Sequence, residues 1–263
     1  MSKLLQWVLP SLAILFLAQT SSGYDASKHM GKEGGQGKGG HSGHGYGRPK
    51  GPPSDIPAHI KEKSSPDGRE INLNNSQIGV AGMSVLAQTP DIRNVVSMAL
   101  QGNKLGDDGV KILAASETFK HVELLNLWGN EITGSGARML ADSPHLANLK
   151  ELKLTRNQIG DEGIIALAQS PNASHLTLLN VDGNQITDKG ALAIANSPHL
   201  ANLKSLDLYN NQIGPEGVKA LVQSKFLTSL ESLILVRNSV DIDTALALEK
   251  TATLPKLKSL EMY

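Results

Sequence analysis

Adjacent carboxylates are the residues of this chain whose types and spacing suit acid–base chemistry. Pairs occur at Asp107-Asp108 and Asp161-Glu162, and a further carboxylate stands at Glu216. Each falls where a helix is expected to begin, and the helix dipole favours acidic residues there without any catalytic role. The sequence has neither a Gly-x-Ser-x-Gly nucleophile elbow nor a His-Glu-x-x-His zinc motif. We therefore predict no catalytic residue and no enzymatic activity.

The histidines of the same region give catalysis no better support. The octapeptide that runs from Ser143 to Lys150 recurs unchanged from Ser197 to Lys204. Two histidines, at 145 and 199, are copies within it, so we interpret them as duplicated loop residues and not as bases.

Large aromatic and arginine side chains suit recognition, because Trp, Tyr and Arg anchor protein interfaces. Beyond residue 68 there are only five aromatic residues. Three of them, Trp128, Tyr209 and Tyr263, share one position in a 27-residue repeat. The other two, Phe119 and Phe226, fall near expected return loops, and we expect them in the core.

The overall composition excludes several classes of function. In 263 residues, 25 Lys and Arg balance 25 Asp and Glu, so no net field attracts nucleic acid or an acidic membrane surface. Because the chain has no cysteine, it has no disulfides, thiolate metal sites or Cys nucleophile. Aromatic residues make up 3% of the chain and hydrophobic residues 40%, which favours a repetitive core of aliphatic side chains. We expect no cofactor and no structural metal.

Residues 1–23 have the three-part pattern of a secretory signal peptide. Lys3 supplies the positive charge, an apolar run extends from Leu4 to Ala18, and small polar residues follow as far as Gly23. The run is shorter than the about 20 residues that span a bilayer. We expect cleavage, with an uncleaved anchor as the alternative. The mature chain is then secreted or periplasmic and has no membrane span.

Residues 24–68 are rich in Gly, His, Lys and Pro, and such a composition buries too little apolar surface to offset its conformational entropy. We predict a flexible arm. Its histidines at His29, His41 and His44 are a type that binds divalent transition metals weakly, but a solvated linker without metal is the reading we favour.

From residue 69 onward the sequence repeats every 27 residues without an insertion. Three columns carry the repeat: an asparagine column, and two aliphatic columns two residues apart that precede it. The asparagine column is Ser76, Asn103, Asn130, Asn157, Asn184, Asn211 and Asn238. The aliphatic columns include Leu125, Leu152, Leu179 and Leu206, and Leu127, Leu154, Val181 and Leu208.

Each unit is predicted to be a strand, a turn, a helix and a return loop. Leu152 and Leu154 alternate with polar residues, as in a strand with one buried face. Asn157 then lies where the chain leaves the sheet, and its amide suits unpaired backbone groups. A helix is expected to follow over residues 160–168. N-cap residues are expected at Thr133, Thr187 and Asp241, and Pro215 is expected at the first position of its helix.

These residues resemble a known family. The pattern Leu149-x-x-Leu152-x-Leu154-x-x-Asn157-x-Ile159 is similar to the leucine-rich repeat. The 27-residue length and the Gly-x-x-Gly helix start resemble the ribonuclease-inhibitor-like subclass, which includes Ran GTPase-activating proteins. The resemblance covers residues 69–263 as seven repeats and a closing strand. It implies an α/β fold, a right-handed horseshoe-shaped solenoid with a parallel sheet on the concave side and helices on the convex side.

Alternation along the strands then predicts which side chains line the concave face. Trp128, flanked by Arg156 and Tyr209, forms the centre of the predicted site. The alternative is that these aromatics merely suit a β surface. The full set of predicted partner-binding residues is Trp128, Lys153, Thr155, Arg156, Asp182, Tyr209, Arg237 and Tyr263.

The favoured function is non-enzymatic recognition of a protein partner on the concave face, with a glycan as another ligand class. The alternative is regulation of an enzyme, as the likeness to GTPase activators and nuclease inhibitors implies. Extracellular eukaryotic members of the resembled family have disulfide-closed caps, so the absence of cysteine favours a bacterial source. No caps are expected, which leaves Leu257, Leu260 and Met262 exposed at the C-terminal end and suggests self-association there.

Overall fold

The structure is a computed structural model and describes residues 51–263. The signal peptide predicted for residues 1–23 and the part of the arm at residues 24–50 lie outside the described residues. Both stay predictions, as does weak metal binding by the histidines of the arm. The described residues fall in a unit that extends from Gly47 to Tyr263.

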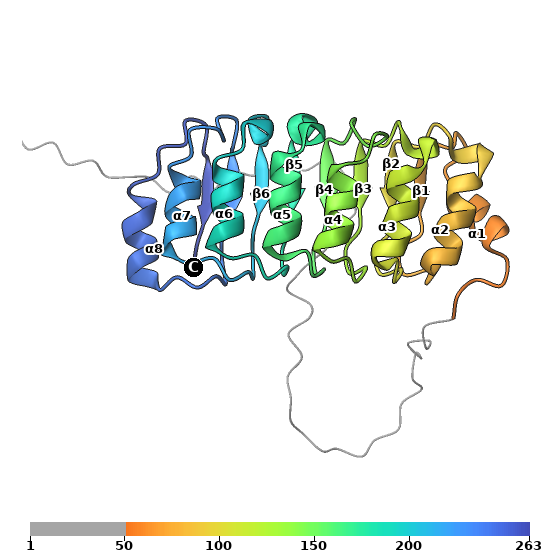
Figure 1. Ribbon diagram of the computed structural model, residues 1–263, viewed down its shortest axis with the longest axis horizontal. Helices are drawn as coiled ribbons and strands as arrows, with labels where there is room; N and C mark the ends of the chain where they lie inside the picture. Colours follow the sequence, from red (N-terminus) through yellow and green to blue (C-terminus); the bar gives the residue numbers. More distant parts are fainter. Residues whose placement is uncertain (1–50) are drawn as a thin grey trace, which may run out of the picture. The chain divides into compact units, whose positions relative to one another are not determined.

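A single parallel sheet forms the inner side of this unit, and each strand pairs with its neighbours in sequence (Figure 1). The register places Leu125 beside Leu152 and repeats at every later strand pair. The middle residue of β2 to β7 is buried, which confirms the predicted aliphatic column. The strands are β1 (Glu70–Asn72), β2 (Ser97–Ala99), β3 (Leu124–Asn126), β4 (Glu151–Lys153), β5 (Leu178–Asn180), β6 (Ser205–Asp207), β7 (Ser232–Ile234) and β8 (Ser259–Glu261).

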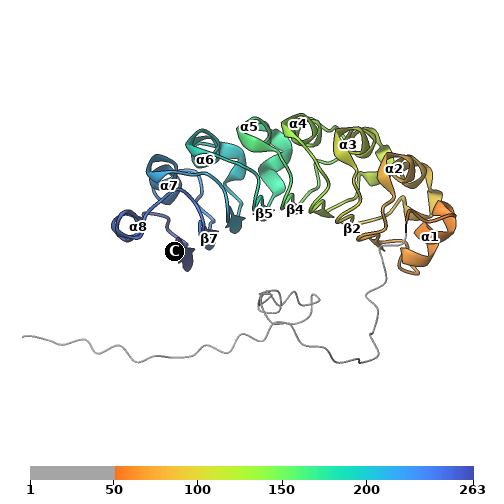
Figure 2. The same ribbon diagram turned by 90° about the horizontal axis from the view of Figure 1, so that it is seen from below.

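Helices cover the other side of the sheet. Figure 2 shows them along the outer side of an arc whose inner side is formed by the strands. The α-helices are α1 (Ile56–Lys63), α2 (Gly79–Gln88), α3 (Gly106–Ala115), α4 (Gly134–Ala141), α5 (Gly160–Gln169), α6 (Asp188–Ala195), α7 (Pro215–Val222) and α8 (Ile242–Glu249). Short 3-10 helices in the return segments are η2 (Pro90–Ile92), η3 (Glu117–Phe119), η4 (Pro171–His175) and η5 (Pro198–Leu200).

The predicted helix starts are confirmed. Thr133 and Thr187 accept hydrogen bonds from backbone N–H groups at the starts of α4 and α6, and Asp241 does so at α8. Pro215 begins α7, where its missing N–H leaves no bond unmade.

The asparagine column forms the ladder that the sequence predicts. Asn157 Nδ2 donates to the carbonyls of Leu127 (3.0 Å) and Leu154 (2.8 Å). Its Oδ1 accepts from the N–H groups of Asn130 and Ile132, both at 3.0 Å. One side chain thus satisfies backbone groups of two repeats, and leaving such buried groups unmet costs about 1–3 kcal/mol each. Equivalent bonds occur at Asn103, Asn130, Asn184, Asn211 and Asn238.

A second ladder, on the return side, was not predicted from the sequence. The Ser143 hydroxyl donates to the carbonyl of Ala114 at 2.6 Å, which joins the ends of two successive helices. The same bond recurs for Ser170, Ser197 and Ser224 with Ala141, Ala168 and Ala195. Each serine follows the end of a helix and bridges to the preceding repeat.

The predicted arm ends earlier than residue 68, because α1 and the segment after it pack on the first repeat. Ile60 is fully buried. The Ser65 N–H donates to the Glu70 carbonyl at 2.8 Å, and the His59 ring lies 2.9 Å from the Ser76 hydroxyl. The predicted boundary of the flexible arm at residue 68 is therefore wrong, because the segment from α1 onward packs on the first repeat. The Gly- and Pro-rich composition of residues 24–68 gave no indication of this short helix, which has one buried apolar side chain.

Two predictions about solvent exposure also need correction. Phe119 is fully buried, but Phe226 is 40% exposed, because Leu227 takes the buried position that Phe119 occupies in its own repeat. At the C-terminal end, Met262 was predicted to be exposed, but the residue is only 8% exposed.

Candidate functional site

Two arginine–aromatic pairs stand on the concave face. The Arg156 guanidinium lies over the Trp128 ring, 5.4 Å from its centroid. The Arg237 guanidinium lies over the Tyr209 ring at 5.5 Å. In both pairs the arginine comes from the repeat after the aromatic residue, so each pair ties two repeats together. At exposed sites such a contact contributes about 0.5–1 kcal/mol to stability. Because the fold depends little on it, these side chains are available for a further role.

The last residues of β3, β5 and β6 fix the backbone that presents the side chains two positions later. Asn126 Oδ1 accepts from the Trp128 N–H at 3.1 Å, and Asp207 Oδ1 accepts from the Tyr209 N–H at 3.0 Å. Asn180 does the same for Asp182 at 3.1 Å. These side-chain turns hold the chain as it leaves the sheet. This role was not predicted from the sequence; an Asn or Asp two positions before the displayed residue is the signal.

Both arginines have a left-handed backbone, with φ of 52° at Arg156 and 60° at Arg237. A non-glycine residue seldom adopts such a conformation. At the equivalent position of other repeats stand Asn75, Gly102, Gly129, Gly183 and Asn210.

Carboxylates lie between the two pairs. Burial raises the pKa of Asp182, the nearby Asp207 raises it further, and the Arg156 charge opposes both effects. Burial also raises the pKa of Asp207, while the hydrogen bonds from the Tyr209 N–H and from Asn180 lower it and the Glu261 charge raises it. Asn180 Nδ2 donates to Asp207 Oδ2 at 2.8 Å. The centre of the site is therefore acidic and partly desolvated.

The predicted residues divide into three groups. Trp128, Arg156 and Asp182 form one connected cluster, and Tyr209 with Arg237 forms the second pair. Lys153, half-buried in β4, lies in register between Asn126 and Asn180.

Two predicted residues do not join these groups. Thr155 is only 8% exposed and donates to Asn180 Oδ1 at 2.7 Å, so its prediction as an exposed contact is wrong. Tyr263 is 63% exposed, and its hydroxyl donates to Glu249 of α8 at 3.3 Å. It follows β8, one strand beyond the repeat of Arg237.

The helix-start carboxylates have structural partners. Asp161 Oδ1 accepts from the N–H groups of Thr187 and Gly190, at 2.9 and 3.0 Å. Asp107 and Asp188 bind the starts of the next helices in the same manner. Each carboxylate thus stabilises the helix of the following repeat, a contact between repeats that the dipole argument did not foresee.

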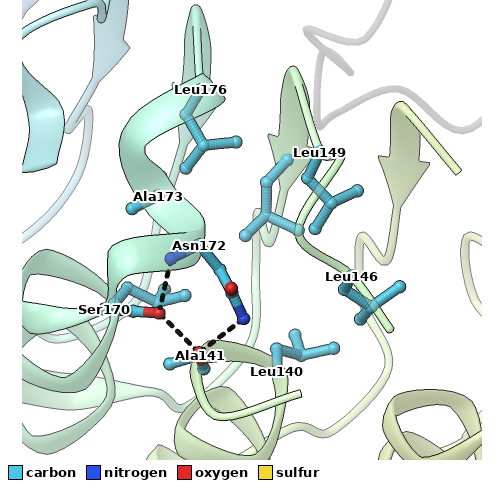
Figure 3. A pocket seen from close by; sticks show the side chains of 10 residues that line it. Leu140, Ala141, Leu146, Leu149, Ser170, Asn172, Ala173 and Leu176 are labelled. Atoms are coloured by element: carbon cyan, nitrogen blue, oxygen red, sulfur yellow. Dashed lines mark hydrogen bonds between the residues drawn. The ribbon is translucent and has the colours of Figure 1, made fainter. Parts of the chain in front are cut away.

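A gap in the core between two repeats is drawn in Figure 3. Leucines such as Leu140, Leu146 and Leu149 line it, and Asn172 Nδ2 donates to the carbonyl of Ala141 (3.1 Å) at one side. Its volume is about 10 Å³, at the lower limit for one water molecule. It is a packing defect and not a ligand site.

Residues 51–263 contain no cluster of three or more His, Cys, Asp or Glu side chains with metal-binding geometry. Within the same residues, no helix has the length and apolar character needed to cross a membrane.

The parallel sheet, the constant register and the asparagine ladder define an α/β solenoid of the leucine-rich-repeat class. Four segments of the chain, residues 120–141, 145–168, 172–195 and 199–222, match a family model described as Leucine Rich repeat. They cover less than half of the chain. None of the curated proteins matches it.

Two plant receptors are among the similar solved structures. A plant peptide hormone receptor, RGFR1, solved in complex with RGF2, is 19% identical with a TM-score of 0.38, and the match covers 68% of this chain and 25% of that chain. The leucine-rich-repeat ectodomain of the receptor kinase GASSHO1/SCHENGEN3 from Arabidopsis thaliana, in complex with CASPARIAN STRIP INTEGRITY FACTOR 2, is 20% identical with a TM-score of 0.36. That match covers 68% of this chain and 20% of the receptor. The chain thus spans a quarter or less of each receptor's length.

Proposed function

We propose that this protein is a non-enzymatic recognition scaffold that binds a protein partner on the concave face of its sheet. The binding surface is centred on the two pairs Trp128–Arg156 and Tyr209–Arg237, with Lys153 and Asp182 beside them. The partner class follows from side-chain type, because aromatic and arginine residues dominate protein interfaces. Glycan binding, and self-association through the C-terminal end, are less favoured outcomes.

One observation carries the proposal most strongly. Arg156 and Arg237 leave the sheet in a left-handed conformation and lie over aromatic rings on the concave side. The same left-handed conformation recurs in the turn of other repeats, at Gln77, Lys104, Glu131 and Gln185. What distinguishes the two arginines is that an aromatic ring of the preceding repeat holds each guanidinium on the concave side, where it is available to a partner.

The subclass and the location belong to the same proposal. A ribonuclease-inhibitor-like solenoid from a bacterium, exported by the signal peptide of residues 1–23 and acting as a secreted or periplasmic protein, accords with the sequence pattern. Regulation of a partner enzyme is the alternative, and it differs in what the bound partner does and not in where it binds.

A library selection tests the proposal without knowledge of the partner. The full chain is used as bait for phage-displayed peptides, and the enriched clones are assayed against Trp128→Ala, Tyr209→Ala and Leu192→Ala. Leu192 is an exposed residue of α6 on the convex side. We expect the enriched clones to lose affinity for the first two variants and to keep it for the third.

The melting temperature of each variant is measured alongside. Clones that bind Trp128→Ala and Tyr209→Ala as well as they bind the unaltered chain would reject the concave face as the binding surface. A protein from which no clone is enriched above background would reject peptide recognition itself.

A further inference from the structure

The first left-handed backbone position after each of strands β1 to β7 is occupied by Gly or Asn except where an aromatic residue stands in the preceding repeat. A second left-handed position two residues later is less restricted and holds Gln77, Lys104, Glu131 and Gln185. The Gly and Asn residues are Asn75, Gly102, Gly129, Gly183 and Asn210. The two exceptions are Arg156, which follows Trp128, and Arg237, which follows Tyr209. The strained position thus receives an arginine only where a ring is present to hold the guanidinium flat.

Stacking of this kind leaves the N–H edge of the guanidinium available. Neither Arg156 nor Arg237 forms an ion pair within residues 51–263. A planar fork of N–H donors matches a carboxylate in a bidentate geometry. Asp182 partly offsets the charge of Arg156, because that arginine lowers the pKa of Asp182.

Two carboxylates that form no salt bridge among the described residues come from the repeats between the two arginines. Asp182 and Asp207 come from successive repeats, and each oxygen of Asp207 accepts a hydrogen bond from Asn180 or the Tyr209 backbone. The Asp182 carboxylate accepts no hydrogen bond among the described residues, and neither group forms a salt bridge there. A cationic group placed between them would relieve their mutual repulsion.

The spacing of these charges has a simple geometric match. Neighbouring strands of a sheet lie about 4.8 Å apart. Arg156 and Arg237 come three repeats apart, which corresponds to about 14 Å across the strands, and Asp182 and Asp207 come from the two repeats between them. In an extended peptide, side chains on one face recur every second residue, at about 6.8 Å, so positions i, i+2 and i+4 span about 13.6 Å.

We propose that the concave face binds an extended peptide segment with acidic, basic and acidic residues at positions i, i+2 and i+4, lying across the strands. The outer carboxylates bind Arg156 and Arg237, and the central Lys or Arg binds Asp182 and Asp207. This inference rests on the proposed function, since it specifies the partner of the same surface. It does not fix the direction of the peptide, because the pattern is symmetric.

Three blocked synthetic peptides test the pattern by calorimetry with the full chain at pH 7. The first contains Glu-Ser-Lys-Ser-Glu between glycines, the second reverses every charge as Lys-Ser-Glu-Ser-Lys, and the third contracts the spacing as Ser-Glu-Lys-Glu-Ser. We expect the first peptide to bind at least about tenfold more tightly than either of the others, because charge complementarity sets specificity. Equal affinities of the three, or no binding of the first, would overturn the proposal.

Glycine variants at the two arginines separate binding from folding. Glycine is the residue at the equivalent position of three other repeats, so Arg156→Gly and Arg237→Gly should keep the melting temperature. We expect both variants, and Asp182→Asn as well, to bind the first peptide more weakly. Arg93→Ala, an exposed arginine of a return segment, is the matched control and should leave affinity unchanged. Folded Arg237→Gly protein with full affinity would overturn the proposal.

The result is distinguishable from a failure of the proposed function. If the affinity of the library clones depends on Trp128 and Tyr209 while the three synthetic peptides bind with equal affinity, the concave face is the binding surface. Only the proposed class of peptide is then wrong.

Discussion

Arg237 holds its guanidinium over the ring of Tyr209, 5.5 Å from the ring centroid, from a backbone whose φ is 60°. The contact joins two successive repeats and repeats the geometry of Arg156 over Trp128. A strained backbone and a stacked side chain therefore occur together twice in one solenoid. This coupling underlies the first prediction.

The stability of variants at Arg237 should depend on how well the new residue tolerates a positive φ. Glycine accepts positive φ, so in Arg237→Gly the relief of strain roughly offsets the lost stacking and the gain in chain entropy. We expect its free energy of unfolding to stay within about 1 kcal/mol of the unaltered chain. Arg237→Val places a β-branched residue in the same conformation and should destabilise by about 1–3 kcal/mol. Urea denaturation measures both; equal stabilities would show that φ at this position is not strained.

The asparagine ladder and the concave aromatic should have opposite phenotypes. Asn157→Ala removes bonds to the carbonyls of Leu127 and Leu154 and to two N–H groups, so we expect a loss of at least about 1–3 kcal/mol. Trp128→Ala loses a contact that contributes about 0.5–1 kcal/mol and should retain the fold. Thermal unfolding of the two variants compares them directly. An unfolded Trp128→Ala protein would mean that this side chain belongs to the core.

Helix α1 should stabilise the first repeat as a cap. Ile60→Ala empties a fully buried site, and such a truncation costs about 2–5 kcal/mol. Because contacts in a solenoid are with nearest neighbours, the amides of β1 should exchange with deuterium faster while those of β5 change little. Ile242→Ala, at an exposed position of α8, is the control. Uniform acceleration along the whole chain would contradict a local capping role.

The half-buried Asp182 should make stability depend on pH. Its pKa is raised in the folded state, so the folded chain binds more protons than the unfolded chain as pH rises through the ordinary Asp range. Stability from this group is therefore full below the ordinary Asp pKa and is lost as pH rises from there through the folded pKa. Asp182→Asn should raise the melting temperature at pH 7 and have little effect near pH 3. An equal shift at both values would assign the effect to something other than ionisation.

Much of the fold was predictable because the repeat is uninterrupted. A constant interval places Leu125, Leu152 and Leu179 in one buried row, and the same register predicts that Trp128 and Arg156 are neighbours. The helix caps at Thr133 and Thr187 follow from residue type and position alone.

Other features depend on side-chain contacts that no periodic pattern specifies. Thr155 occupies an outward position but turns its hydroxyl to Asn180, which removes it from the surface. Helix α1 escaped prediction because its burial rests on one isoleucine within a Gly- and Pro-rich segment. The pairing of strain with stacking at Arg156 needed backbone angles, because an arginine side chain has many rotamers that do not reach a ring.

Hydroxyl-radical footprinting with a selected ligand tests the central claim most directly, because it reports which aromatic side chains the ligand covers. The full chain is oxidised with and without a peptide from the library selection, and oxidation is quantified at Trp128, Tyr209 and Phe226, which lies off the concave face and is exposed. We predict that the ligand protects Trp128 and Tyr209 and leaves Phe226 unchanged. Protection of Phe226 with unchanged oxidation of Trp128 and Tyr209 would contradict recognition on the concave face.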